Sequence, residues 1–137
     1  MKVNEKDRQA LESCGVDYSE GLEKFLDEEE LYCGLLVDFL AENTFDEAKR
    51  CIEEGDKEGF LWAVHAMKSA TGTLSMNGLY RLCFDTVEEV RGGDIADAKE
   101  TFCKAYEVYQ GIADCIRRVL GDRINVTEEQ QNIHNTV

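Results

Sequence analysis

Apolar residues recur every three or four positions along most of this chain, which is the spacing of helices that bury one face. In the clearest stretch, residues 94–121, the apolar positions alternate steps of four and three, the pattern of a seam between the helices of a bundle. The seam consists of Ala98, Phe102, Ala105, Tyr109, Ile112, Ile116 and Val119. The pattern predicts a long final helix that packs against others along this line.

Polar capping residues and glycines interrupt the pattern and set the expected ends of the helices. The expected helices cover residues 5–14, 17–26, 28–42, 44–55, 56–74, 76–91 and 94–121. The side chain of Asn43 or Thr44 is expected to cap the fourth helix, with Asp46 or Glu47 returning the bond. Asp56 is expected to cap the fifth.

The chain contains no proline, which favours long uninterrupted helices. Its 137 residues suit one domain with a single core. We therefore predict an all-α domain over residues 1–121, an antiparallel up-down four-helix bundle with short additional helices at its N-terminal end. Residues 122–137 are polar and mostly aperiodic, so a flexible C-terminal tail is expected there.

The charge balance excludes several classes of partner. Fifteen basic and 29 acidic residues give a formal net charge of −14. Binding to nucleic acid or to an anionic membrane surface needs clustered cations, so neither is expected. No apolar run is long enough to span a membrane, and the N-terminus carries no secretory signal pattern. We expect a monomeric, cytoplasmic protein that its own charge keeps in solution.

The cysteines give no sign of a disulfide framework or of a zinc site. The chain has six, at positions 14, 33, 51, 83, 103 and 115. None forms a C-x-x-C pair, and no histidine stands at zinc-finger spacing from two of them. We expect reduced thiols, several of them packed in the core.

The helix expected over residues 56–74 carries a histidine on its polar side. Its apolar arc consists of Phe60, Ala63, Val64, Met67, Ala70, Thr71 and Leu74. At about 100° per residue, His65 points roughly opposite the centre of this arc. The histidine is therefore expected in solvent at the middle of a rigid helix.

The neighbours of His65 are unusual for a purely solvated face. Lys68 can reach the same space, and the small residues Ser69 and Gly72 leave the imidazole accessible. Glycine inside a helix costs about 0.8–1 kcal/mol relative to alanine, so Gly72 needs a compensating role, either at a partner or in a tight contact between helices. Leu61 and Trp62 offer apolar contact at the edge, although Trp62 could instead lie half in the core.

The stretch 65–74, His-Ala-Met-Lys-Ser-Ala-Thr-Gly-Thr-Leu, resembles the signature of histidine-containing phosphotransfer (HPt) domains. That signature has His-x-Leu-Lys-Gly, then small residues, a second glycine and spaced leucines. The resemblance extends over roughly residues 15–120. It includes residues 15–17, 21–22, 30–39 and 54–56 upstream and Leu79, Leu82 and Cys83 downstream.

The resemblance implies a function and assigns roles. His65 would accept a phosphoryl group on Nε2 from an aspartate of a response-regulator receiver domain, or pass one to it. Lys68 would support the phosphate charge, while Leu61, Trp62, Ser69 and Gly72 would contact the partner. The receiver domain would bring the magnesium ion and the acidic cluster, and a hybrid histidine kinase would be a further partner.

An exposed imidazole is mostly neutral at pH 7 and is a competent nucleophile, which agrees with such a carrier. The sequence contains no Walker loop and no glycine-rich ATP loop. We therefore expect no phosphorylation from ATP, no cofactor and no enzymatic activity of the chain's own.

Two departures from the family pattern keep an alternative open. Ser69 and Ser75 stand where the family has glycine, so a degenerate domain that docks a receiver or kinase without carrying phosphate is the second hypothesis. The third is an unrelated bundle with an incidental histidine. A di-metal bundle lacks its Glu-x-x-His ligands, because Trp62 and Gln131 precede the two histidines by three residues. His134, in the expected tail, is predicted to be idle.

The sequence begins as a free-standing module would, although a fragment of a longer hybrid kinase would look similar.

Overall fold

The computed structural model describes residues 3–135, and the side chains of residues 3–121. Every regular element in this described part is an α-helix, as the sequence predicts. The helices are α1 (Glu5–Cys14), α2 (Tyr18–Lys24), α3 (Glu29–Ala41), α4 (Thr44–Glu54), α5 (Lys57–Thr73), α6 (Asn77–Arg91) and α7 (Ile95–Asn135). The expected boundaries agree with these within two residues, except at the end of α7.

Most helix ends have the local causes that the sequence predicts. The carboxylates of Asp17, Asp56 and Asp94 accept hydrogen bonds from backbone N–H groups of α2, α5 and α7, at 3.1, 2.9 and 3.0 Å. Gly15 and Gly55 end α1 and α4 with left-handed φ angles of 114° and 77°. These residues set the first turns of α2, α5 and α7 and the ends of α1 and α4.

The predicted cap of α4 is wrong. Asn43 occupies the cap position, but its side chain makes no capping hydrogen bond. The hydroxyl of Thr44 donates to the carboxylate of Glu42 at 3.4 Å, outside the helix. The loop from α3 is so short that the competing acceptor at residue 42 lies within reach, which the capping pattern alone does not show.

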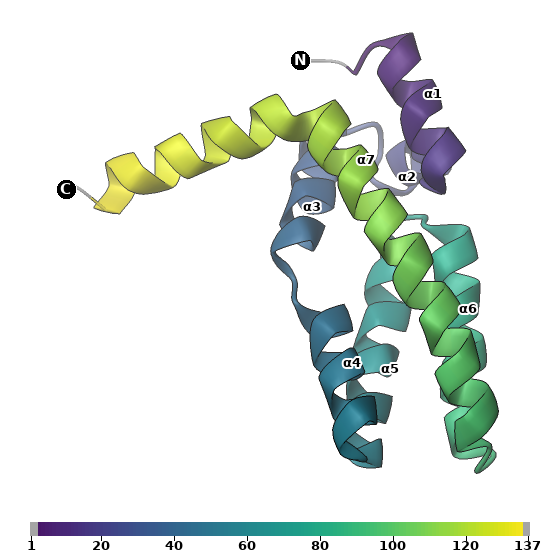
Figure 1. The fold of residues 1–137 in the computed structure, drawn as a ribbon. Helices are drawn as coiled ribbons and strands as arrows, with labels where there is room; N and C mark the ends of the chain where they lie inside the picture. Colours follow the sequence, from purple (N-terminus) through teal and green to yellow (C-terminus); the bar gives the residue numbers. More distant parts are fainter. Residues whose placement is uncertain (1–2, 136–137) are drawn as a thin grey trace.

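The final helix is interrupted beside Gly121, where the sequence predicts its end, and a second helical segment follows. Leu120 has non-helical angles (φ −112°, ψ 19°), and the helical backbone continues beyond this kink to Asn135. Regular structure thus extends into the segment that the sequence pattern assigned to a flexible tail. Figure 1 shows this last part of α7 directed away from the other helices. The side chains of Gln131 and His134 lie outside those described.

The helices pack in a consistent order of neighbours. α5 lies between α4 and α6, while α6 packs along α7. α3 and α1 also contact α7, and α4 touches it more lightly. Figure 1 shows α3 and α4 following one another along one side, with α7 crossing the molecule. α7 is therefore the element against which most others pack.

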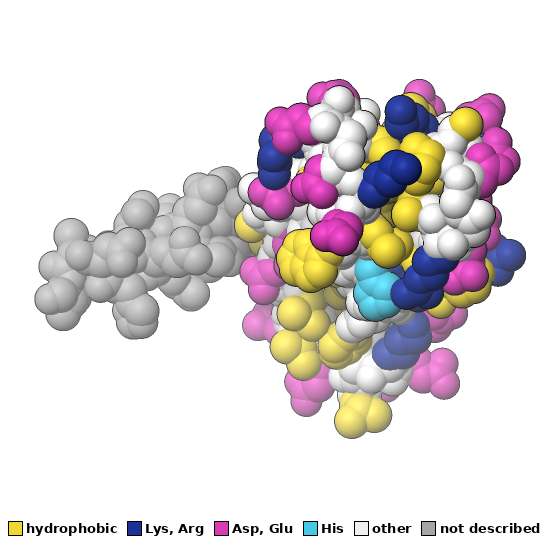
Figure 2. Space-filling view, turned by 90° about the horizontal axis from the view of Figure 1, so that it is seen from below, with side chains coloured by type: hydrophobic (Ala, Val, Ile, Leu, Met, Phe, Trp, Pro, Cys, Tyr) yellow, Lys and Arg dark blue, Asp and Glu magenta, His cyan; other side chains and the backbone are white. Residues whose placement is uncertain are grey.

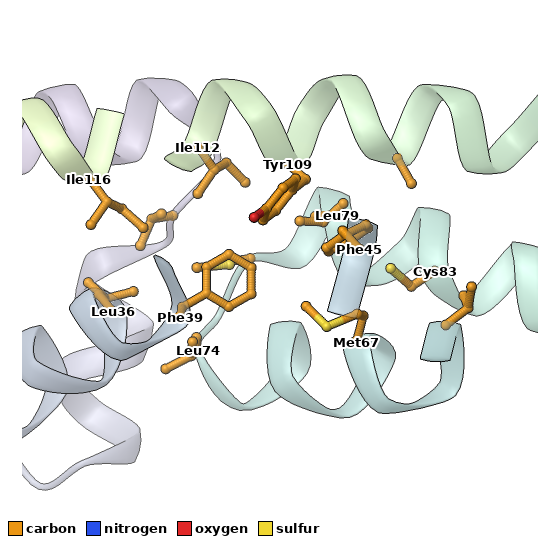
Figure 3. Close-up of a cluster of buried hydrophobic side chains, with 14 of the residues drawn as sticks. Leu36, Phe39, Phe45, Met67, Leu74, Leu79, Cys83, Tyr109, Ile112 and Ile116 are labelled. Atoms are coloured by element: carbon orange, nitrogen blue, oxygen red, sulfur yellow. The ribbon is translucent and has the colours of Figure 1, made fainter. Parts of the chain in front are cut away.

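A continuous apolar core joins these helices (Figure 3). The ring of Tyr109 on α7 stacks on Phe45 of α4 at 4.4 Å and meets the edge of Phe39 of α3 at 5.8 Å. Nearly all of the predicted seam of α7 is buried, including Ile112 and Ile116 with no exposed surface. This confirms the helical phase that the spacing predicts for α7.

The apolar face of α3 is only partly internal. Tyr32, Leu36 and Phe39 are buried, but Leu31 is 53% exposed and Leu35 is half-buried. A face that reads as uniformly apolar in the sequence thus contributes both core and surface. Leu35 belongs to the edge of a groove described below.

All six cysteines are free thiols, and Cys33, Cys51, Cys83 and Cys115 are buried. Burial raises the pKa of Cys83 to about 12, so this thiol stays protonated. Within the described part of the chain, no helix combines the length and apolarity needed to cross a bilayer.

Candidate functional site

α5 presents His65 to solvent, as its helical phase predicts. The opposite face of the helix is buried, with Phe60, Val64 and Met67 at 2% exposure or less. His65 itself is exposed, and no other described side chain hydrogen-bonds its ring. A rigid helix, capped by Asp56 and held by its buried face, therefore fixes an accessible imidazole in one direction.

Lys68, one turn after His65, leans toward α6. Its Nζ lies 5.5 Å from the centroid of the half-buried Phe84 ring. The guanidinium of Arg81 lies over the same ring, with Cζ 5.2 Å from the centroid. Cations at this distance are attracted by the negative face of the ring, so one aromatic side chain holds two positive charges.

Gly72 is explained by packing between helices. A Cβ added there would lie 3.1 Å from Cδ2 of Tyr80 on α6, tighter than ordinary carbon contacts. The absence of a side chain therefore lets the Tyr80 ring approach α5 closely. The sequence left two explanations open for a glycine inside this helix, a partner or a tight contact between helices. The contact with Tyr80 provides the second. Any contribution of Gly72 to partner binding stays a prediction.

Ser69 is exposed beside His65, and its hydroxyl donates to the backbone oxygen of His65 at 3.4 Å. It also lines a groove of about 440 Å³ between α3 and α5. The walls of this groove include half-buried Leu35 and the carboxylates of Asp38 and Glu42. One side of the histidine face is therefore an acidic-rimmed groove, while the other carries cations.

The two apolar residues predicted beside the site differ in exposure. Trp62 is 68% exposed, so it does not lie half in the core, whereas Leu61 is half-buried against the core. Figure 2 shows this face, with hydrophobic side chains around the cyan histidine and basic side chains next to it. A large apolar side chain in solvent beside a histidine is compatible with a contact surface for a partner.

The end of α5 is tied to α2 by a polar cluster. Ser75 has a left-handed φ of 59° and is fully buried, and its hydroxyl donates to Glu20 at 3.0 Å. The ammonium of Lys24 donates to the Gly72 carbonyl at 2.8 Å and lies 3.1 Å from Glu20. Hydrogen bonds from Lys24, Ser75 and Asn77 lower the pKa of Glu20 below its ordinary value.

Ser69 and Ser75, the two departures from the HPt pattern, lie in different surroundings. Ser75 lies at the end of α5, ten residues after His65, and its backbone accepts a bond from Asp17 N at 2.9 Å. Its side chain serves the α2–α5 connection. Only Ser69 lies beside the imidazole, where it adds a small hydroxyl.

Metal or thiol chemistry finds no support at this face. Among the described side chains, no group of three or more His, Cys, Asp or Glu residues could hold a metal ion. The cysteine on α5's neighbour α6, Cys83, is buried and protonated. The polar groups described at this face are an imidazole, two cations, small hydroxyl groups and the carboxylates of the neighbouring groove.

Sequence reasoning missed the contribution of α6. Tyr80, Arg81 and Phe84 border the histidine face, but none of them was expected there. The spacing of Tyr80 and Phe84, four residues apart with a cation between, is a signal of a shared surface stripe. Which helix this stripe faces follows only from the packing of α5 on α6.

Comparison of the chain with known protein families, with curated proteins and with solved structures finds no match. The assignment of function therefore rests on the residues and their geometry.

Proposed function

We propose that this protein is a phosphocarrier of a two-component phosphorelay, with His65 as the residue that accepts and donates the phosphoryl group. The observation that carries the proposal is the exposed imidazole at the middle of the rigid helix α5, with Lys68 one turn away. The resemblance of residues 65–74 to the HPt signature supplies the partner class, a receiver domain phosphorylated on aspartate.

The transfer needs little from the carrier beyond position and charge. The lone pair of Nε2 attacks the phosphorus atom, and a P–N bond forms while the bond from phosphorus to the aspartyl oxygen breaks. The electron pair leaves with that oxygen, which restores the aspartate carboxylate. The reverse transfer passes the group on. The partner provides the magnesium ion, and this chain provides an accessible nucleophile.

The charges around His65 favour a bound phosphoryl group. The whole chain carries a net charge of −14, so a phosphate elsewhere on its surface would meet repulsion. Lys68 has no acidic ion-pair partner among the described side chains, which leaves its ammonium for an incoming anion. On the side of His65 away from the acidic groove, Lys68 therefore supplies a cation on an otherwise acidic protein.

The packing of the helices supports an up-down four-helix bundle as the scaffold of this carrier. In this proposal α3 and α4 together form one column, and α5, α6 and α7 form the others, with α1 and α2 as additions. The neighbour order α4–α5–α6–α7, closed by the contact of α4 with α7, is the order such a bundle requires. A monomer in the cytoplasm is the working state in the same proposal.

A docking module without phosphotransfer is the second candidate, because Ser69 replaces the glycine of the pattern. The exposed hydroxyl of Ser69 weakly bonds its own helix at 3.4 Å and leaves the ring of His65 uncovered. This geometry favours the carrier over the docking module, since nothing at Ser69 blocks the nucleophile. The two candidates differ in whether a phosphoryl group becomes attached.

The test is incubation of the protein with a receiver domain phosphorylated on aspartate, followed by intact-mass and radiolabel measurements. We expect wild-type protein to gain one phosphoryl group in an acid-labile, alkali-stable form, as phosphohistidine does. His65→Gln should gain none. His134→Gln, which removes the other histidine of the chain, should be labelled as the wild type is.

Labelling of His65→Gln at the wild-type level would remove His65 as the acceptor. Binding of the receiver without any labelling, under conditions in which another HPt domain is labelled, would establish the docking module instead. Circular dichroism of each variant excludes unfolding as the cause, since an exposed substitution should leave the helices intact.

A further inference from the structure

The aromatic ring of Phe84 gathers two cations that come from different helices. Lys68 Nζ on α5 and Arg81 Cζ on α6 lie 5.5 and 5.2 Å from its centroid. The ring is half-buried and packs near Tyr80, with the two centroids 6.3 Å apart. Phe84 is therefore a fixed platform, and both cations are held at the surface above the core.

The pairing of α5 with α6 places Lys68 and Arg81 at the same aromatic ring. Tyr80 faces Gly72, and Phe84 faces Lys68, so the two helices run antiparallel, and later residues of α6 lie opposite earlier residues of α5. Arg81 reaches forward along α6 to Phe84 and to Asp85, whose Oδ1 lies 3.3 Å from its Nε. Its guanidinium therefore lies at the same ring as the ammonium of Lys68, which follows His65 by three residues on α5.

The neighbouring acidic groups leave donors of Arg81 unused. The ion pair with Asp85 uses Nε, and a guanidinium has further N–H donors on its two Nη atoms. Glu88, one turn farther along α6, lies 3.6 Å from Arg91 and is engaged there. The Nη atoms of Arg81 are therefore left for an anion bound beside Phe84, the ring at which Lys68 also lies.

We propose that Arg81 and Lys68, held on the ring of Phe84, form a two-cation clamp that binds the phosphoryl oxygens at His65. Arg81 is the new element: a positioning residue contributed by α6, with a planar fork suited to two phosphate oxygens. The assignment rests on the proposed phosphocarrier function for its biological ligand. Its anion-binding property can be tested independently of any transfer.

The first experiment titrates the protein with inorganic phosphate at low ionic strength, where charge interactions are least screened. NMR signals of the His65 ring and the Arg81 side chain report binding. We expect Arg81→Gln to weaken phosphate binding about three- to tenfold, the size of one charge-assisted contact at an exposed site. Arg81→Lys should fall between that variant and the wild type, because it keeps the charge and loses the fork.

A matched control is Arg117→Gln on α7, which removes the same charge from an exposed arginine. Arg117 pairs with Asp114 at 3.2 Å, as Arg81 pairs with Asp85. Arg117 is exposed on α7, near the end of the helix where α1 packs, so this variant should bind phosphate as the wild type does. Phe84→Leu should weaken binding as Arg81→Gln does, since it removes the platform.

Equal phosphate affinity of Arg81→Gln and Arg117→Gln would overturn the clamp, as would the absence of any phosphate-dependent shift in the wild type. The receiver assay separates this result from the proposed function. Normal labelling of His65 together with Arg81-independent phosphate binding would leave the carrier standing and remove the clamp. Arg81-dependent phosphate binding without labelling would keep the clamp and remove the carrier.

Discussion

Individual side chains along α5 and at its end have different physical roles. His65 is exposed, Lys68 rests on an aromatic ring, and Gly72 makes room for Tyr80. Ser75 adopts a left-handed conformation that costs a non-glycine residue about 1–2 kcal/mol, offset by its bond to Glu20. The exposed side chain of His65 and the residues that support the structure, Gly72 and Ser75, are therefore at separate positions along and just after α5.

The role of Lys68 predicts a kinetic effect without a structural one. Lys68→Ala should slow phosphotransfer to His65, or shorten the lifetime of the phosphorylated form, by about three- to tenfold because the phosphate loses a nearby cation. Unfolding free energy should change by no more than about 0.5 kcal/mol, as for other surface positions. Time courses of labelling and urea unfolding measure the two quantities.

Lys104→Ala on α7 is the control, since it removes the same side chain from an exposed helix position, whereas Lys68 is half-buried beside Phe84. It should leave both quantities unchanged. A large loss of stability in Lys68→Ala would mean that the ammonium and its stem support the fold, which contradicts a role confined to the surface.

The lowered pKa of Glu20 predicts a pH-dependent attachment of α2. The bonds from Lys24, Ser75 and Asn77 favour the ionised carboxylate in the folded protein. This stabilisation is present above the ordinary pKa of 4.5 and is lost as the pH falls through the lower folded-state value. Unfolding free energy measured from about pH 6 to about pH 3 should therefore fall less steeply for Glu20→Gln than for the wild type. Identical slopes would contradict this assignment.

Whole helices meet through a few positions where side-chain size is decisive. α2 approaches α3 at Gly21, where an added Cβ would lie 2.1 Å from Cζ of Tyr32. Tyr32 cannot move aside easily, because it has no exposed surface and its hydroxyl donates to the Leu74 carbonyl at 2.7 Å. The contact of α2 with α3 therefore depends on the missing side chain at residue 21.

This contact predicts opposite effects for two glycine substitutions. Gly21→Ala should lower the unfolding free energy by about 1–3 kcal/mol, the cost of overpacking a rigid contact. Gly34→Ala on α3, where no atom lies within 4 Å of the added Cβ, should raise it by about 0.8–1 kcal/mol through helix propensity. Urea unfolding of the two variants gives the comparison. A higher unfolding free energy for Gly21→Ala than for the wild type would show that the ring of Tyr32 can move aside, which contradicts this prediction.

The whole molecule is organised around α7, whose buried side contacts helices from both ends of the chain. Tyr109 meets α3 and α4, and Cys115 on the same helix donates to the Ala10 carbonyl of α1 at 3.4 Å. Because segments distant in sequence pack on α7, a cavity along this helix should lower the unfolding free energy of the whole domain. The kink lies at Leu120, which is itself buried.

Ile112 is the position at which this dependence is best measured. Ile112→Ala should lower the unfolding free energy by about 2–5 kcal/mol, because the side chain has no exposed surface and the truncation leaves a cavity. Val108→Ala, at an exposed position on the same helix, should cost less than about 1 kcal/mol. Leu35→Ala should lie between them, since Leu35 is half-buried at the groove. Equal losses at residues 108 and 112 would contradict the burial pattern of α7.

The positions of the helices could be predicted from the amino-acid sequence alone. Helix positions and most caps follow from neighbours within four residues, which is why Asp56, Gly15 and the outward direction of His65 were predicted. The segment after Leu120 differs, because its weak apolar periodicity gave no helical signal although the backbone there is helical.

The surroundings of His65 required the packing of helices distant in sequence. Phe84 holds Lys68 because α6 lies antiparallel to α5, and the groove at Ser69 exists because α3 stands apart from α5. Such contacts depend on the summed fit of many side chains across the core, and no short window of sequence contains that information. The amino-acid order thus identified the exposed histidine, and the assembled helices supplied the charge and the shape around it.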